Sequence, residues 1–160
     1  MKTAIVYYSQ SGNTEYVAKA CARLLGADLI PIAPVKEYPS TGFKKFLWGG
    51  KSAVMGEAPR LENYVFDAEA YEGIILGCPV WAGTFAPPLR TFIEENREGL
   101  RDKRIAAFAC CSGGPGKVME KLKKVLSLDA LAGELILVDP KEKPSEENEA
   151  RIKAFCDAMR

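Results

Sequence analysis

Continuous apolar runs alternate along this chain with segments of helical period, beginning within the first 25 residues. The run at residues 4–8 predicts a strand, from residue 1 or 2 onward, that is buried on both faces of a sheet. Val17, Cys21 and Leu24 then recur at helical spacing and predict a helix over residues 14–25. The chain therefore opens with a buried strand that is followed directly by a helix.

The same alternation continues to the C-terminus. Further strands are predicted at 29–32, 73–78, 104–110 and 134–138, and further helices at 42–54, 87–96, 117–127 and from 145 onward. Five strands that alternate with helices predict an α/β fold, with a parallel sheet covered by helices on both faces and right-handed crossovers. No repeat or linker divides the chain, so we expect one domain over residues 1–160.

Three loops rich in small and polar residues follow the first, third and fourth predicted strands. They contain Ser9, Gln10, Ser11, Gly12, Asn13 and Thr14 in the first loop, Pro79, Val80, Trp81, Ala82, Gly83 and Thr84 in the second, and Cys110, Cys111, Ser112, Gly113 and Gly114 in the third. Parallel strands place their carboxyl ends at one edge of a sheet, where open α/β sheets bind ligands. We therefore expect the three loops to form one binding site.

The first loop joins a buried strand to the start of a helix, which is a position that suits an anion. The backbone N–H groups of a first helical turn have no partner within the helix, and the helix dipole is positive there. Ser9, Ser11 and Thr14 add hydroxyl donors, and Gly12 permits close backbone approach. An ordinary capped turn explains the same residues. Because the loop has no lysine, we expect neutral donors to hold any anion bound there.

Composition narrows the chemistry that this edge can support. The chain has no histidine, which excludes imidazole catalysis and histidine metal ligands. Its five cysteines include no CxxC pair, so we expect no metal site and free thiols in a reducing cytoplasm. The net charge of +1 favours neither nucleic acid nor an anionic membrane, and no segment resembles a signal peptide or a membrane span. We expect a soluble cytoplasmic protein.

Several phosphate-binding motifs fail against these loops. Gly116-Lys117 lacks both the preceding glycine and the following hydroxyl of a Walker A loop, and no G-x-G-x-x-G follows the first strand. Neither Cys78 nor the Cys110–Cys111 pair has the arginine that a cysteine phosphatase requires. A flat, partly apolar ligand with one phosphate satisfies all three loops. Its phosphate would meet neutral donors, and its ring would meet the tryptophan of the second loop.

The loops resemble those of the flavodoxin family, in particular its short-chain flavodoxin-like members. The sequence SQSGNT at 9–14 is similar to the family's [TS]-x-[TS]-G-N-T phosphate loop, which is the most specific part of the match. GCPVWAGT at 77–84, followed by Pro87-Pro88, resembles the second flavin loop, and residues 109–114 match the position of the third. The resemblance covers essentially the whole chain. It implies a three-layer, doubly wound sandwich with strand order 2-1-3-4-5 and FMN between strands one and three, as flavodoxins obey the general rule for such sheets.

The resemblance also implies a role for each loop. The phosphate would be held by Ser9, Gln10, Ser11, Asn13 and Thr14. Trp81 would pack against the isoalloxazine ring, although a tryptophan that only anchors the loop explains the residue too. Backbone groups around Ala82–Gly83 would bond to flavin N5, with Gly83 allowing a peptide flip on reduction. Residues 110–114 would offer N–H groups to the pyrimidine edge, and their cysteines are explained equally by packing.

The leading functional prediction is electron transfer through non-covalently bound FMN, to redox partner proteins or a small redox substrate. An NAD(P)H-dependent FMN or quinone oxidoreductase is the first alternative, because the third loop has no aromatic residue to cover one flavin face and the 36–51 segment is basic. A flavin-free domain that only binds a partner is the second. The sequence leaves open whether the protein is an enzyme.

The oligomeric state also stays open. The 40–60 segment contains Phe43, Phe46, Leu47 and Trp48, which is more apolar than a surface helix needs. These side chains would suit a dimer contact, and burial in the core explains them equally well.

Overall fold

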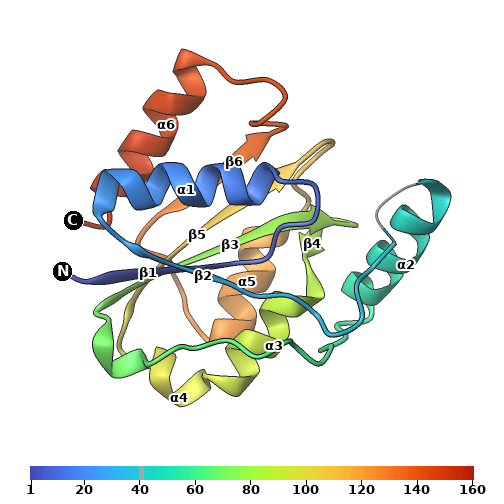
Figure 1. The fold of residues 1–160 in the computed structure, drawn as a ribbon, viewed down its shortest axis with the longest axis horizontal. Coiled ribbons are helices and arrows are strands. Elements are labelled where there is room, and N and C mark those ends of the chain that lie inside the picture. Colours follow the sequence, from blue (N-terminus) through green and yellow to red (C-terminus); the bar gives the residue numbers. More distant parts are fainter. Residues whose placement is uncertain (40–41) are drawn as a thin grey trace.

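The protein is a parallel sheet between helices, and the order of its strands is the predicted one (Figure 1). The computed structural model describes residues 1–39 and 42–160, with side chains described for 1–39 and 48–160. The parallel strands are β1 (Thr3–Tyr7), β2 (Asp28–Pro31), β3 (Gly73–Trp81), β5 (Arg104–Cys111) and β6 (Glu134–Val138). Their order, β2-β1-β3-β5-β6, confirms the predicted 2-1-3-4-5 arrangement once the short β4 (Thr84–Phe85) is set aside.

The helices form the outer layers. They are α1 (Asn13–Leu25), α2 (Gly42–Val54), α3 (Pro87–Glu95), α4 (Arg97–Leu100), α5 (Val118–Leu126) and α6 (Glu146–Asp157), with a 3₁₀ turn η1 at Ala68–Ala70. Figure 1 shows α1 and α6 over one face of the sheet, α3 and α5 over the other, and α2 beyond the sheet's right-hand edge. The predicted helices are all present, and the two short elements η1 and α4 were not predicted.

Each central strand contributes to two cores, one on each face of the sheet. Ile5 packs in the cluster that contains Val17 of α1 and Ile152 of α6. Its neighbour Val6 packs in the opposite cluster with Leu89 of α3. Successive strand residues point to opposite faces, so a strand covered on both sides must be apolar at every position. This is why the apolar runs in the sequence identify the buried strands.

Gly77 makes room in the sheet for a large aromatic side chain. It pairs in register with Phe108 of the neighbouring strand β5. A Cβ atom placed on Gly77 would lie 2.6 Å from Cε1 of the Phe108 ring, a separation that carbon atoms do not adopt. The ring therefore occupies the space that any larger residue at position 77 needs.

The predicted loop over 79–84 is wrong except at Ala82 and Gly83, because β3 continues to Trp81 and forms a hairpin with β4, which begins at Thr84. Gly77 turns its carbonyl toward Tyr8, whose N–H donates to it at 3.1 Å. Backbone directions alternate along a strand, so Pro79 turns its nitrogen to the same side, where β1 has already ended. The missing N–H costs no ladder hydrogen bond there, and proline does not end the strand.

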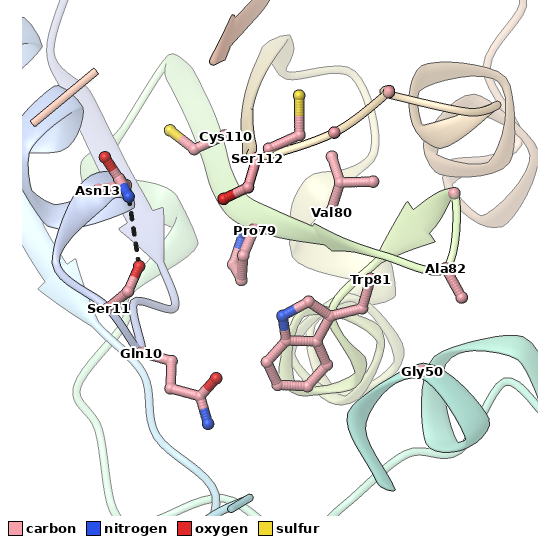
Figure 2. Close-up of a pocket in the computed structure, with 14 residues that line it drawn as sticks. Gln10, Ser11, Asn13, Gly50, Pro79, Val80, Trp81, Ala82, Cys110 and Ser112 are labelled. Atoms are coloured by element: carbon pink, nitrogen blue, oxygen red, sulfur yellow. Dashed lines mark hydrogen bonds between the residues drawn. The ribbon is translucent and has the colours of Figure 1, made fainter. Parts of the chain in front are cut away.

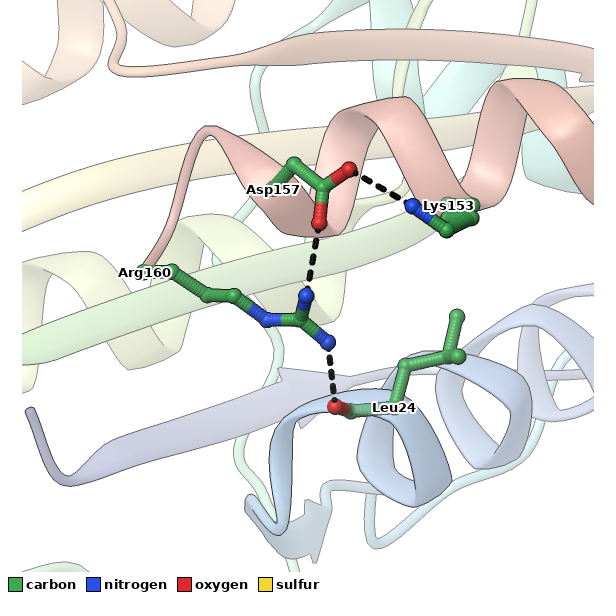
Figure 3. A network of polar contacts seen from close by, with 4 residues as sticks. All are labelled: Leu24, Lys153, Asp157 and Arg160. Atoms are coloured by element: carbon green, nitrogen blue, oxygen red, sulfur yellow. Dashed lines mark hydrogen bonds and ion pairs between the residues drawn. The ribbon is translucent and has the colours of Figure 1, made fainter.

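The C-terminal residues fasten α6 to α1 (Figure 3). Arg160 donates one hydrogen bond to Asp157 Oδ1 at 2.8 Å and another to the carbonyl of Leu24 at 2.9 Å. Lys153 donates to the other oxygen of Asp157 at 3.0 Å. A cation on the last carbonyls of α1 suits the negative end of that helix, although exposed pairs of this kind contribute at most about 1 kcal/mol each.

Two sequence expectations concern the surface. The proposed dimer contact at Phe43, Phe46 and Leu47 involves side chains outside the described residues, whereas Trp48 is described and is 54% exposed. No helix in the described part of the chain is long and apolar enough to cross a membrane.

Candidate functional site

A cavity of about 460 Å³ lies at the carboxyl edge of the sheet, between the three predicted loops (Figure 2). It is lined by Gln10, Ser11, Asn13, Gly50, Pro79, Val80, Trp81, Ala82, Gly83, Cys110, Cys111, Ser112, Gly113 and Gly114. Its size is within the usual range for small-molecule and cofactor sites. The sheet thus brings residues of all three loops around one space. This agrees with the rule that open α/β sheets bind ligands at the carboxyl ends of their strands, called the edge rule below.

Four predicted site residues lie outside this lining. The Ser9 hydroxyl accepts the N–H of Glu15 at 3.1 Å and so caps the first turn of α1. Thr14 is buried, and Gly12 is the residue that immediately precedes α1. Thr84 pairs with Trp81 across the hairpin. These four residues build the loops, while their neighbours face the cavity.

The first loop presents backbone donors at the start of α1. Gly12 adopts φ 97°, a left-handed conformation that favours glycine. Among the described residues, the N–H groups of Gly12, Asn13 and Thr14 have no hydrogen-bond acceptor. The Asn13 amide donates to the Ser11 hydroxyl at 3.4 Å, which orders the loop beside these donors (Figure 2). The end of the cavity at this loop therefore suits an anion.

Gln10 offers an acceptor instead of a donor. Its Nε2 donates to the carbonyls of Tyr38 and Pro39, each at 3.2 Å. Its Oε1 is buried and has no partner among the described residues. Figure 2 shows this oxygen turned toward Trp81. A buried acceptor fits a ligand hydroxyl, so only the backbone N–H of Gln10 is left for the phosphate role predicted for it.

Trp81 forms one wall of the cavity and is held in place from several sides. Its indole packs edge-to-face against Tyr8 at 5.7 Å and against Tyr38 at 5.0 Å between ring centroids. A Cβ placed on Gly49 of α2 would lie 3.2 Å from Trp81 Cε3, so the helix backbone packs directly on the ring. This contact explains the glycine at position 49. Its neighbour Gly50 lines the cavity, which the sequence did not predict.

The hairpin after Trp81 is fixed to the start of α5. Ala82 and Gly83 have φ values of 51° and 72°, which is the positive pair that a two-residue hairpin turn requires. The Gly83 carbonyl accepts the N–H of Lys117 at 3.0 Å. A Cβ on Gly116 would lie 2.8 Å from that carbonyl oxygen. A flip of the Gly83–Thr84 peptide would therefore break the bond to Lys117, whereas the preceding peptide is free of that bond.

A fourth segment, Asp139–Lys141, connects the first and third loops. The Ser112 hydroxyl donates to Asp139 Oδ1 at 2.7 Å, and the Asp139 N–H donates to the carbonyl of Cys111 at 3.0 Å. The Lys141 N–H donates to Asn13 Oδ1 at 2.9 Å. The sequence analysis missed this segment. The edge rule contained the signal, because these residues directly follow the fifth parallel strand.

Comparison with known proteins shows which family the chain belongs to. The sequence profile of the family described as flavodoxin matches residues 2–138. The chain belongs to the flavodoxin family. The expected membership, read from the SQSGNT and GCPVWAGT loops, is thus confirmed.

Solved structures share the flavodoxin fold over nearly the whole chain. A candidate flavoprotein from Bacteroides eggerthii DSM 20697 superposes with a TM-score of 0.77 and 24% identity, covering 98% of this chain and 96% of that one. A flavoprotein from Lactobacillus acidophilus NCFM, solved in complex with FMN, gives 0.71 and 22% over 88% and 95%. Two-electron reduced Megasphaera elsdenii flavodoxin gives 0.63 and 17% over 99% of both chains. At these identities the likeness concerns the fold.

The cysteines beside this flavodoxin-like site are poor nucleophiles. Burial raises the pKa of the Cys78 thiol to about 12. Burial also raises the pKa of Cys110 to about 12, although a hydrogen bond from Thr14 offsets part of the shift. Burial and the Asp139 carboxylate raise the pKa of Cys111. All three groups are protonated at neutral pH, which favours the packing explanation over thiol chemistry.

Proposed function

We propose that this protein binds FMN non-covalently in the cavity between its three loops and transfers electrons through it. Membership of the flavodoxin family supports FMN as the cofactor. The observation that carries the proposal is the arrangement of the cavity, with N–H groups at the start of α1 that have no partner in the described part of the chain and the indole of Trp81 on a separate wall. That arrangement matches a ligand with a phosphate at one end and a flat ring at the other.

The residues present fit each part of FMN. The N–H groups of residues 12–14 suit the phosphate. The buried Gln10 oxygen suits a hydroxyl of the ribityl chain, since an acceptor without a donor is costly at a buried position. Trp81 offers a large planar surface to the ring. Residues 110–114 line the remaining side of the cavity.

FMN supplies the redox chemistry when it is bound. The residues of this chain bind and orient it, and the Trp81 wall excludes water from one side of the cavity. The chain has no histidine, and the thiols at the site are protonated at neutral pH. A side chain poised for acid–base work is thus missing from the described lining, which supports a carrier that exchanges electrons with partner proteins or a small redox substrate.

An NAD(P)H-dependent FMN or quinone reductase is the second candidate, and one observation favours it. Cβ atoms placed on Gly113 and Gly114 would meet nothing within 4 Å, so the third loop leaves space beside the cavity for a second planar substrate. Stopped-flow mixing of FMN-loaded protein with NADPH or NADH separates the two proposals. We expect the flavin absorbance to persist, as for a carrier, and rapid bleaching by either nucleotide would favour the reductase.

The place of action is part of the proposal as well. We place the protein in the cytoplasm, and the five buried cysteines, all present as thiols, support a reducing compartment.

Replacing Asn13 by alanine is expected to weaken FMN binding about tenfold or more and riboflavin binding far less. The Asn13 amide holds both Ser11 and the Lys141 N–H, so its loss disorders the donors around the phosphate, which riboflavin lacks. Titration of each flavin into the flavin-free variant, followed by fluorescence, measures both affinities. Equal losses for the two flavins would place the phosphate elsewhere.

A further inference from the structure

Lys141 lies directly over the first loop, although it is far from that loop in sequence. Its backbone N–H is bonded to Asn13 Oδ1 at 2.9 Å, which fixes where its side chain begins. A Cβ atom placed on Gly12 would lie 2.9 Å from Lys141 Nζ and 3.4 Å from Cδ. The aliphatic part of the lysine therefore crosses Gly12, and the ammonium lies against the start of α1.

Lys141 is exposed, and its ammonium lies at a place where an anion would be favoured. The start of α1 carries the positive end of the helix dipole and the unpartnered N–H groups of residues 12–14. Within the described residues, no carboxylate lies within 4.0 Å of Lys141 Nζ, since the ion pairs found there use other cations. Glu15, the acidic residue in the first turn of α1, pairs instead with Lys19 at 2.8 Å.

The field of Lys141 nevertheless reaches this part of the helix. The pKa of Glu15 is lowered first by its hydrogen bond to Lys19 and, to a smaller extent, by the charge of Lys141. Three positive features, the dipole, the N–H groups and the ammonium, thus converge on one space. An anion of more than one negative charge is the ligand that satisfies them together.

We propose that Lys141 pairs with the FMN phosphate and sets the preference of this protein for FMN over riboflavin. The inference rests on the proposed FMN function, and it replaces the expectation that neutral donors alone hold the phosphate. Lys141 reaches the start of α1 from the segment that follows β6, so in this proposal the phosphate lies between the first loop and the segment after the last strand. Its affinity then depends on ionic strength, as that of a charge pair does.

Lys141→Met is the test variant, because methionine keeps most of the aliphatic length and removes the charge. Lys143→Met is the matched control. Lys143 is two residues further on, and its largely exposed side chain places the ammonium 3.7 Å from Asp139. Neither change removes a buried contact, so both variants are expected to fold, which thermal unfolding of the flavin-free proteins checks.

FMN and riboflavin are titrated into wild type and both variants at low and high sodium chloride. We expect Lys141→Met to weaken FMN about 10- to 100-fold at low salt, with riboflavin unchanged and the salt dependence largely lost. Lys143→Met is expected to change FMN affinity by less than about threefold. Unchanged FMN affinity in Lys141→Met, or equal losses for both flavins, overturns the role of Lys141. A wild-type protein that takes up no FMN instead overturns the proposed function itself.

Discussion

Replacing Trp81 by alanine is expected to weaken FMN binding about 100-fold, and to weaken riboflavin binding by a similar factor. The indole is a wall of the cavity, and a 100-fold loss corresponds to about 2.8 kcal/mol of binding free energy, which is the order expected when a stacking contact with a planar ring is removed. Since the lost contact is with the ring that both flavins share, the phosphate does not protect FMN from the loss. Fluorescence titration of both flavins into the flavin-free variant measures the effect.

The chain provides a matched control in its second tryptophan, Trp48, which is 54% exposed on α2 and does not line the cavity. Trp48→Ala is expected to change neither flavin affinity appreciably. Trp81→Phe keeps a planar ring and is expected to retain most of the binding. If Trp81→Ala binds FMN as tightly as wild type, Trp81 only anchors the hairpin and the flavin ring lies elsewhere.

Replacing Gly77 by alanine is expected to lower the free energy of unfolding by about 3 kcal/mol. The added methyl would overlap the Phe108 ring, and both residues are held in register by neighbouring strands that cannot easily separate. Chemical denaturation of the flavin-free protein measures this loss. The site itself is untouched, so the effect is on stability.

Two comparisons isolate the cause. Gly113→Ala places its methyl in open space and is expected to change stability by less than about 0.5 kcal/mol. Combining Gly77→Ala with Phe108→Leu removes the overlapping ring edge, so the double variant is expected to lose less than the sum of the single losses. Strict additivity, or a Gly77→Ala protein as stable as wild type, would show that the sheet adjusts without cost.

The fold could be predicted from the sequence because its determinants are local. Val6 and Ile5 point to opposite cores, so both must be apolar, and a run of such residues identifies a central strand. The last helix is capped by Ser145, whose hydroxyl accepts the N–H of Asn148 at 3.1 Å. Ile152, on the inner face of this helix, is buried. The hydrophobic period of an element and its capping residue both involve residues that are close in sequence. The order of the elements then limits the possible sheet topologies.

The end of β3 was harder to predict, because proline usually ends a strand. Whether Pro79 costs a hydrogen bond depends on which side its nitrogen faces and on where the neighbouring strand stops. Both are properties of the assembled sheet. The same holds for Gly49, whose role is visible only once α2 packs against Trp81.

The site could be predicted as far as its three loops, since the edge rule places them together. Lys141 could not be found from the first loop, because its contact with Asn13 joins residues that are 128 positions apart. The available side-chain oxygen of Gln10 could not be predicted from the sequence either. Its role follows from two carbonyls near residue 38 that occupy the amide nitrogen. Long-range hydrogen bonds of this kind decide which atom of a predicted residue faces the ligand.

The most direct test of the central claim is titration of FMN into the flavin-free protein, with fluorescence and the visible spectrum recorded together. The account predicts saturable quenching at one FMN per chain and the absorption bands of a protein-bound oxidised flavin, which bleach reversibly with a chemical reductant. A protein that leaves added FMN unquenched and stays colourless would contradict it, and would favour a flavodoxin-like domain that only binds a partner.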